Sequence, residues 1–443
     1  MKRVAAVLLA GLWACGGAGS ASRPDHVVLI SIDTLRADHL GAYGHSRPTS
    51  PHLDRLAQGG AVFENAISPS PWTLPAHASL LTGLTPSGHG VRTPDQRLPD
   101  DVALLAESLS RAGFVTGAVV NSRYLGRRFG FDRGFDHFEA LPAPAGGAPS
   151  RVEEAALRWL ERNAGAPRWF LFVHFYDVHS DYGAAPETEA IFVGAGGSVV
   201  TGSTQELTAV RRGERALSAA DLERLRGLYD AGIRQVDEAV GRLMEGLADR
   251  DLLGRTGLVV TSDHGEEFLE HGGVLHGRTH YREVLRVPLI WHGPGVAPGV
   301  RIAAPVSLVD VVPTVLAGLG VPLPAALDGV DLGPRLAGRP SGPNSRRFVV
   351  AEGDHGNEEP DVLRSIRGPR FALIHDRRTQ RAQLYDWTAD PGEQRNRSEE
   401  LPGVRDELAR SLERATRDAR RPTLGEPLTP EEQAELRALG YLR

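Results

Sequence analysis

The chain has 443 residues, 24% of them charged and 41% hydrophobic, with a formal net charge of −6. This is an ordinary globular composition, long enough for one big domain or a domain with a smaller one. We expect no nucleic-acid partner, because no basic patch is large enough to neutralise a run of phosphates. The only cysteine is Cys15, which excludes an intrachain disulfide.

The first residues have the pattern of an export signal. Lys2 and Arg3 precede an apolar run over residues 4–14, which is too short to span a bilayer as a helix. Residues 12–15, Leu-Trp-Ala-Cys, resemble a bacterial lipobox. We therefore expect a signal peptide at 1–14 and a lipidated Cys15 with a flexible tether at 15–25, which would anchor the protein in the periplasm or at the outer membrane. A plain secretory signal with a chance cysteine is the alternative.

Buried strands then alternate with amphipathic helices. Strands are predicted at residues 26–32, 61–66, 114–120, 169–175, 257–261 and 287–291, and helices at 53–60, 102–112, 151–163, 217–249 and 308–319, with a further apolar helix between Thr73 and Gly83. This order favours crossover connections and a doubly wound, mostly parallel sheet. Residues 184–213 lack periodicity and are predicted to be a surface insertion, of the kind that can form a lid.

The pattern changes after a Gly- and Pro-rich linker near residues 340–344. Short strands at 347–352, 362–367, 371–375 and 383–387 follow without helices between them, which predicts a small antiparallel sheet. A last helix is predicted over 430–439. We place a catalytic domain at 26–345 and a C-terminal subdomain of the same fold at 346–443.

Polar side chains stand where open α/β sheets bind ligands. Asp33 ends the first strand, and Asp263 and His264 follow the strand at 257–261. Thr73 begins a helix, where unpaired N–H groups suit an anionic ester. These four residues form a sensible set around a divalent cation, which would activate the otherwise weak Thr73 hydroxyl. Helix capping is the alternative role for Thr73 and for Asp33.

Further candidates surround this set. His179 and His77 could protonate a leaving group, Arg278 could hold a non-bridging oxygen, and His276 could contact the substrate. Asp177, His179 and His276 could help to hold a second metal, although their spacing does not favour it. Outside the site, we expect His271 and His280 to be solvated loop residues.

Several segments occur in the order typical of one family. They are residues 32–39 (Ile-Asp-Thr-Leu-Arg-Ala-Asp-His), 80–83, 88–92, 263–267 (Asp-His-Gly-Glu-Glu), 286–289, 310–314, 384–386 and 390–393. With these segments the chain resembles an arylsulfatase-like sulfatase of the alkaline phosphatase superfamily. The resemblance implies an α/β/α sandwich with a large, mostly parallel central sheet and a smaller C-terminal antiparallel sheet with a helix. It also implies metal-assisted ester cleavage through a covalent intermediate.

The resemblance assigns roles to individual residues. Asp33, Asp263 and His264 fall on metal-ligand positions, and His179 falls on a substrate-contacting histidine. Arg278 stands where sulfatases usually have a lysine. The departure is at the nucleophile, because sulfatases use Cys or Ser in Cys/Ser-x-Pro-x-Arg, oxidised to formylglycine. Here residues 73–77 read Thr-Leu-Pro-Ala-His, and threonine cannot give the aldehyde, so we expect no formylglycine.

A threonine ester must be hydrolysed or transferred to an acceptor. Thr73 in this set is similar to the threonine of nucleotide pyrophosphatases, lipoteichoic acid synthases and phosphoethanolamine transferases. We therefore predict a hydrolase of sulfate, phosphate or phosphonate esters, dependent on one divalent ion (zinc, manganese or calcium), acting on a small-molecule, glycan or lipid ester. A cell-surface transferase of a phosphoryl headgroup and a non-catalytic sulfatase-like binding protein are the alternatives.

Overall fold

The computed structural model describes residues 23–143, 151–194, 198–339, 347–355, 357, 361–427, 429–430 and 433. The predicted signal peptide, Cys15, the linker at 340–344 and most of the predicted helix at 430–439 lie outside these residues and stay predictions. Within the part of the chain described, no helix combines the length and apolar character needed to cross a membrane.

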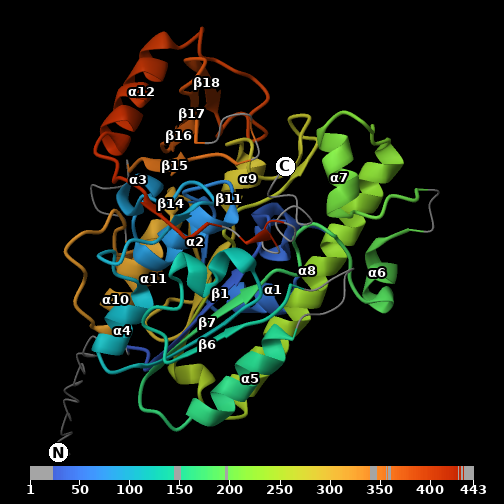
Figure 1. Ribbon diagram of the computed structural model, residues 1–443. Helices are drawn as coiled ribbons and strands as arrows, with labels where there is room; N and C mark the ends of the chain where they lie inside the picture. Colours follow the sequence, from blue (N-terminus) through green and yellow to red (C-terminus); the bar gives the residue numbers. More distant parts are fainter. Residues whose placement is uncertain are drawn as a thin grey trace, which may run out of the picture.

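A central sheet of eight strands organises the molecule (Figure 1). In spatial order the strands are β13 (Val300–Ile302), β2 (Ala61–Phe63), β12 (Leu289–His292), β8 (Thr256–Thr261), β1 (His26–Ile32), β7 (Trp169–Phe175), β5 (Val115–Val120) and β6 (His137–Ala140). The five strands from β8 to β6 are parallel, whereas β12 is antiparallel to both of its neighbours. The prediction of a large, mostly parallel sheet is confirmed.

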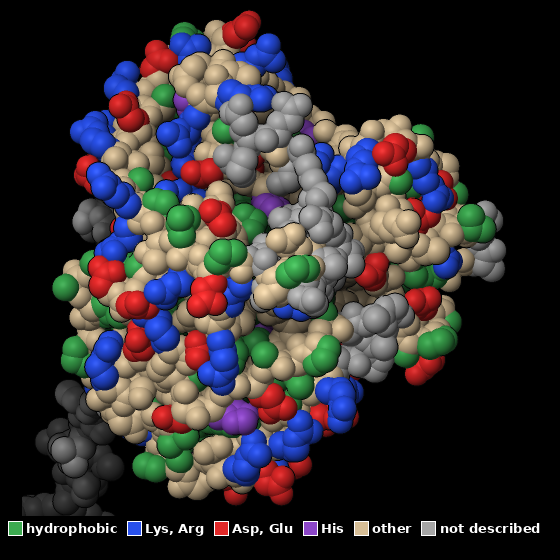
Figure 2. Space-filling model, viewed as in Figure 1, with side chains coloured by type: hydrophobic (Ala, Val, Ile, Leu, Met, Phe, Trp, Pro, Cys, Tyr) green, Lys and Arg blue, Asp and Glu red, His purple; other side chains and the backbone are tan. Residues whose placement is uncertain are grey.

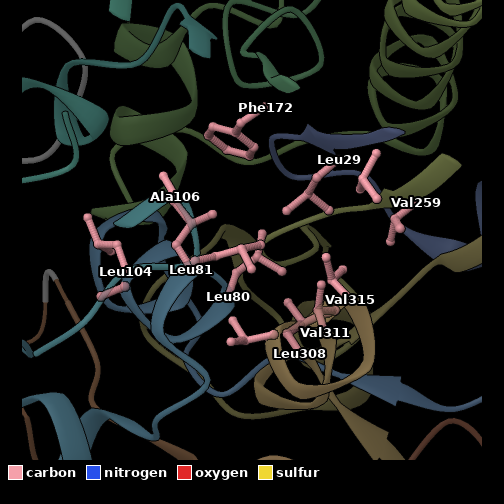
Figure 3. Close-up of a cluster of buried hydrophobic side chains, with 14 of the residues drawn as sticks. Leu29, Leu80, Leu81, Leu104, Ala106, Phe172, Val259, Leu308, Val311 and Val315 are labelled. Carbon is pink, nitrogen blue, oxygen red and sulfur yellow. The ribbon is translucent and has the colours of Figure 1, made fainter. Parts of the chain in front are cut away.

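The alternating side chains of β1 face two different cores, as expected for a strand buried on both faces. Val27 and Leu29 belong to a core built with helices α2 (Thr73–Thr82), α4 (Leu105–Arg111) and α10 (Val311–Leu319), part of which Figure 3 shows. Val28 and Ile30 belong to a second core, built with α1 (Pro51–Gln58), α5 (Val152–Asn163) and α8 (Ala219–Ala248). The sheet is therefore covered by helices on both faces.

The C-terminal part forms its own four-stranded antiparallel sheet, as predicted. Its strands are β15 (Val349–Glu352), β16 (Leu363–Arg367), β17 (Phe371–Asp376) and β18 (Arg381–Asp386). Helix α12 (Pro402–Thr416) covers it by burying Leu408 and Leu412. The sequence analysis missed this helix, because its apolar stripe is narrow within a highly charged segment.

Shorter elements complete the fold. The remaining strands are β3 (Ala66–Ile67), β4 (Gln96–Arg97), β9 (Glu267–Phe268), β10 (Val274–Leu275), β11 (Arg286–Val287), β14 (Val306–Ser307) and β19 (Thr423–Leu424). The remaining α-helices are α3 (Pro86–His89), α6 (Pro186–Phe192), α7 (Thr204–Arg211), α9 (Arg282–Leu285) and α11 (Gly333–Leu336). Short 3-10 helices occur at Ala37–His39, Gly41–Tyr43, Arg123–Leu125, Arg127–Phe129, Leu253–Arg255 and Leu308–Asp310.

Three predicted elements differ in detail. The strand predicted at 61–66 and the one at 287–291 are each divided between the central sheet and a three-stranded sheet of β11, β3 and β14. The insertion at 184–213 is not irregular, because it holds α6 and α7. The Ser203 side chain caps α7 by accepting a hydrogen bond from the Glu206 N–H. A serine at this position is a helix-start signal, but the many small residues around it obscured the signal in the sequence. On the face seen in Figure 2, charged side chains of both signs are interspersed.

The contact between β5 and α5 gives a test of the packing. A Cβ added to Gly117 on β5 would lie 2.3 Å from Cε2 of Trp159, a fully buried side chain of α5. We expect Gly117→Ala to lower the free energy of unfolding by about 1–3 kcal/mol, because the overpacked ring must shift. Gly165→Ala is the matched control, since nothing lies within 4 Å of its added Cβ. Urea unfolding that gave both variants the same stability would contradict this packing.

Candidate active site

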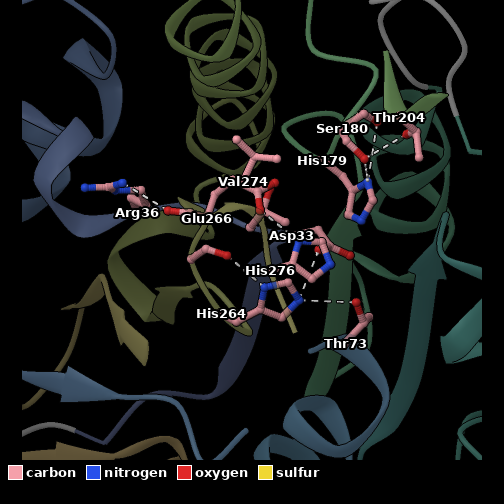
Figure 4. Close-up of polar contacts among 12 residues, drawn as sticks. Asp33, Arg36, Thr73, His179, Ser180, Thr204, His264, Glu266, Val274 and His276 are labelled. Atoms are coloured by element: carbon pink, nitrogen blue, oxygen red, sulfur yellow. Dashed lines mark hydrogen bonds and ion pairs between the residues drawn. The ribbon is translucent and has the colours of Figure 1, made fainter. Parts of the chain in front are cut away.

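The predicted metal-binding residues meet at one edge of the central sheet, and Figure 4 shows three of them, Asp33, Thr73 and His264. Strands β8, β1 and β7 are parallel neighbours, so their carboxyl ends lie side by side. Asp33 follows β1, Asp263 and His264 follow β8, and His174 lies near the end of β7. Helix α2 begins at the same edge with Thr73. The topology thus confirms the expectation that these strand ends converge.

Asp33, Asp263 and His264 form a compact buried cluster. Each offers one ligand atom, and these atoms all lie within 4.8 Å of one another. His264 Nε2 is 3.3 Å from Asp263 Oδ2 and 3.7 Å from Asp33 Oδ1. The Thr73 Oγ1 atom lies 3.4 Å from the same nitrogen. All four side chains are shielded from solvent.

The electrostatics of this cluster are unfavourable without a cation. Within the described part of the chain, neither carboxylate oxygen of Asp33 has a hydrogen-bond partner, and Asp263 Oδ2 has none either. Burial, reinforced by the Asp263 charge, holds the pKa of Asp33 well above its usual range. Burial also acts against ionisation of Asp263, but the His264 and His77 imidazoles lower its pKa. Two buried carboxylates with three oxygens that lack hydrogen-bond partners, beside an imidazole, fit a divalent ion.

Thr73 is the first residue of α2, and the N-cap position belongs to Trp72. The N-cap position, which the capping alternative gave to Thr73, is thus taken by Trp72. Its hydroxyl stands beside the carboxylate cluster, at the positive end of the helix dipole. The helix ends at Gly83 in a left-handed conformation with φ of 73°, as the glycine signal predicted.

His77 lies one turn along α2, on the protein side of the site. Its Nδ1 donates to the Thr73 carbonyl at 3.0 Å, and its Nε2 accepts from the Ser31 hydroxyl at 2.9 Å. Nδ1 also lies 3.4 Å from Asp263 Oδ2. Burial lowers the pKa of His77 to about 3, so the ring is neutral. With both nitrogens engaged by the protein, His77 is placed to position Thr73 and Asp263.

His174 has a comparable place behind Asp33. Its Nε2 lies 3.4 Å from Asp33 Oδ2, and its Nδ1 contacts the Asn121 side-chain oxygen at 3.3 Å. The Asn121 amide donates to Asp177 Oδ2 at 3.2 Å. His174, Asn121 and Ser31 were not among the candidates predicted from the sequence, because only the parallel register brings them together.

Two further histidines pack edge to face beside the cluster. His179, on the loop after β7, and His276, after β10, have ring centroids 4.9 Å apart. The Glu266 carboxylate contacts His276 Nδ1 at 3.0 Å and accepts from the Tyr182 hydroxyl at 2.7 Å. Burial lowers the pKa of both histidines well below the usual range. The nearby His276 ring lowers the pKa of His179 further, and the His264 ring lowers that of His276. Glu266 was missed, although it belongs to the Asp-His-Gly-Glu segment.

Arg278 follows His276 and Gly277 on the same loop. Gly277 has φ of 92°, a left-handed conformation that favours glycine. A second arginine, Arg211 at the end of α7, donates to the His276 carbonyl at 2.9 Å. Burial and then the Arg278 charge lower the pKa of Arg211 to about 10. The site therefore has two cationic side chains near His276, of which the sequence analysis found only Arg278.

Two expectations about other histidines are wrong. His271 is not solvated, because it stacks on Tyr281 and its Nδ1 contacts Glu283 at 2.5 Å. His280 is buried against the C-terminal sheet, where its ring contacts the Gly353 carbonyl at 2.6 Å and the Ser365 hydroxyl at 3.0 Å.

The described residues contain two groups with metal-ligand spacing. One is the cluster of Asp33, Asp263 and His264, and the other is His39, His45 and Asp230. In the second group Asp230 already forms an ion pair with Arg47 at 2.8 Å. Asp177, His179 and His276, considered for a second metal, do not form such a group among the residues described.

Comparisons with known proteins agree with this architecture. The family model described as sulfatase matches residues 25–321, and the one described as N-sulphoglucosamine sulphohydrolase, C-terminal, matches residues 270–418. Human arylsulfatase A is 30% identical over 416 residues, covering 84% of this chain and 78% of its own. The Delta 4,5-hexuronate-2-O-sulfatase of Bacteroides thetaiotaomicron is 26% identical, covering 87% of each chain.

Solved structures show the same fold at lower sequence identity. A protein in complex with its substrate D-glucosamine-2-N,6-O-disulfate has a TM-score of 0.78 at 22% identity, covering 90% of this chain and 98% of its own. The phosphonate monoester hydrolase of Agrobacterium radiobacter has a TM-score of 0.74 at 22% identity, covering 91% and 100%. From its matched sequence and its fold, the chain belongs to the sulfatase family of the alkaline phosphatase superfamily and is a hydrolase acting on ester bonds.

Proposed function

We propose that this protein is a metal-dependent hydrolase that cleaves sulfate, phosphate or phosphonate esters through a covalent intermediate on Thr73. The observation that carries the proposal is the position of the Thr73 hydroxyl. It stands at the start of α2, 3.4 Å from His264 Nε2, beside two buried carboxylates. A secondary hydroxyl in this position cannot be oxidised to an aldehyde, so the formylglycine route of ordinary sulfatases is not open to it.

Asp33, Asp263, His264 and the Thr73 hydroxyl would hold one divalent ion, for which zinc, manganese and calcium are the candidates. Such an ion lowers the pKa of a bound hydroxyl and neutralises negative charge on the reacting group. The protein side chains around it set the geometry. His77 holds the Thr73 carbonyl and lies against Asp263, while His174 lies against Asp33.

The remaining polar residues would act on the substrate. After the Thr73 hydroxyl loses its proton, Oγ1 forms the new bond to sulfur or phosphorus as the bond to the leaving ester oxygen breaks, and the N-terminus of α2 favours the approaching anion. Arg278 holds a non-bridging oxygen, and His276 contacts the substrate beside it. His179, whose ring packs edge to face on that of His276, donates to the ester oxygen that leaves. Water then hydrolyses the Thr73 ester and restores the hydroxyl.

The comparisons support a small-molecule or glycan ester as the substrate class. The substrate named for one structural neighbour is a sulfated glucosamine, and another neighbour hydrolyses phosphonate monoesters. The nucleophile favours esters of phosphorus. An aldehyde hydrate can expel sulfate from its second hydroxyl, whereas a threonine ester needs attack by water at the sulfur or phosphorus atom.

Metal binding can be tested by thermal unfolding of the metal-free protein. Adding zinc, manganese or calcium at about 100 times its Kd should stabilise the wild type by about 2.7 kcal/mol. Asp33→Asn should lose this response. Without metal, the same variant should be more stable than the wild type by about 1–3 kcal/mol, because one of two repelling buried carboxylates is gone.

Asp249→Asn is the matched control for this metal test, because Asp249 is exposed at the end of α8. It should keep the metal response of the wild type. A wild type that none of the three ions stabilises, or an Asp33→Asn variant that is stabilised as much as the wild type, would contradict the metal site.

The nucleophile can be tested on a panel of sulfate monoesters, phosphate monoesters and diesters, and phosphonate esters, each with zinc, manganese and calcium. Thr73→Ala should lower kcat/KM at least about 10³-fold, because the attacking oxygen is removed. Thr73→Ser keeps the hydroxyl and should stay within about tenfold of the wild type. We expect higher rates on phosphodiesters or phosphonate esters than on sulfates.

The same panel separates the alternatives. Full activity in Thr73→Ala, with unchanged thermal unfolding, would show that Thr73 is not the nucleophile. Transfer to an added alcohol in preference to water would identify a transferase. Absence of both metal binding and turnover on every ester class would indicate a non-catalytic binding protein.

A further inference from the structure

We propose that helix α7 of the insertion is a positioning element for the active site. Through Ser180, its Thr204 fixes which nitrogen of His179 carries the proton, and its Arg211 holds the backbone that carries His276. This inference rests on the proposed function, because His179 is there the residue that donates to the leaving oxygen. It assigns a role to an insertion for which the sequence indicated only a surface location.

Thr204 reaches His179 through a chain of two hydroxyl groups (Figure 4). The Ser180 Oγ atom lies 2.9 Å from Thr204 Oγ1 and 3.0 Å from His179 Nδ1. The three side chains are 3–4% exposed, so water does not compete for these contacts. Buried hydroxyl chains of this kind strengthen one another and order their protons.

The direction of the protons follows from the partners of Thr204. Each hydroxyl has one proton to donate. Among the described residues, Ser180 Oγ is the one hydrogen-bond partner of Thr204 Oγ1. If Thr204 accepted from Ser180 instead, its own buried proton would have no acceptor among the described residues, and an unpaired buried donor is rarer than an unused lone pair. We therefore assign the donation from Thr204 to Ser180 and from Ser180 to His179 Nδ1. Since burial lowers the pKa of His179 and keeps the ring neutral, its own proton lies on Nε2, the nitrogen at the far side of the ring from Ser180 (Figure 4).

A competing arrangement is close by. The Ser180 carbonyl lies 3.4 Å from His179 Nδ1, near enough to accept a proton from that nitrogen if the Ser180 hydroxyl turned away. His179 would then carry its proton on Nδ1 and present a lone pair to the substrate oxygen. By donating to Ser180 Oγ, the Thr204 hydroxyl leaves the Ser180 proton directed at His179 Nδ1 and so disfavours this change.

The backbone around this chain is tied to the start of α7. Asp181 has φ of 69°, a left-handed conformation that is uncommon for a residue with a side chain. Its N–H donates to the Gly202 carbonyl at 3.2 Å, and its carboxylate accepts from the Thr204 N–H at 2.7 Å. The Tyr182 N–H also donates to Gly202 at 3.1 Å. The segment that follows His179 is thus clamped to the segment that begins α7.

The other end of α7 holds the opposite histidine. Arg211 Nη2 donates to the carbonyl oxygens of His276 at 2.9 Å and Val274 at 3.2 Å. Although burial lowers the pKa of Arg211 to about 10, its guanidinium stays charged at neutral pH. Helix α7 therefore spans the loops of His179 and His276, whose ring centroids are 4.9 Å apart.

The test compares Thr204→Val, which removes the hydroxyl at nearly constant shape, with Thr204→Ser, which keeps it. Gln205→Ala is the matched control, because Gln205 is exposed on the same helix. Within the ester class that the wild type hydrolyses, we compare a nitrophenyl ester with a phenyl ester. Phenoxide is the poorer leaving group, so cleavage of the phenyl ester depends more on a proton donor than cleavage of the nitrophenyl ester does. Thr204→Val should lower kcat about tenfold more on the phenyl ester, with KM little changed, and Thr204→Ser should restore it.

A second readout does not need catalysis. In full-length protein isotope-labelled at the histidine nitrogens, NMR distinguishes the two neutral tautomers, and His179→Gln identifies the signals. We expect the Nε2-protonated form of His179 in the wild type and the Nδ1-protonated form in Thr204→Val. An Nδ1-protonated wild type, or equal loss on both esters in a folded Thr204→Val variant, would overturn the proposal. A protein inactive on every ester that still shows the tautomer change would refute the proposed function and not this inference.

Discussion

Two buried carboxylates that face each other at the ends of neighbouring strands are the constraint on which this site depends. Asp33 and Asp263 follow β1 and β8, and three of their four oxygens lack hydrogen-bond partners within the described residues. Burying unpaired charge is costly. The fold keeps them there because β1 is packed on both faces and cannot shift its register without exposing two cores. The cation of the proposed function would offset this cost and would couple stability to function at this point.

The residues around Asp33, Asp263 and His264 hold these side chains in place through contacts with the protein. His77 and His174 have ring nitrogens turned to the carboxylates and to protein groups, and both stay neutral because burial lowers the pKa of each. They orient the acidic side chains without adding positive charge that would compete with a metal. Farther out, α7 links the loops of His179 and His276, so a surface insertion takes part in the geometry of the site.

The sequence was sufficient to locate those site residues whose position depends only on the direction of the strands. Asp33, Asp263 and His264 could be predicted to converge, because parallel strands place their carboxyl ends at one edge. The sequence was not sufficient for residues whose role depends on the direction in which the side chain points. His77 was expected to face the substrate, but its position one turn after Thr73 turns its ring into the protein. His271 and His280 looked like loop residues, yet packing against the C-terminal part of the chain buries them. Helix α12 was missed because charge hides its narrow apolar stripe.

Formylglycine chemistry is typical of the sulfatase family, whereas Thr73, the proposed nucleophile, cannot form that aldehyde. The central claim is that this hydroxyl becomes covalently bound to the sulfur or phosphorus of the substrate. The most direct measurement is acid quenching of the metal-loaded enzyme during turnover of an activated aryl ester, followed by mass spectrometry of the intact chain and of its peptides. The account predicts one sulfuryl, phosphoryl or phosphonyl group, located on Thr73 and absent from Thr73→Ala. Steady turnover with the group on another residue, or with no modification of Thr73, would contradict it.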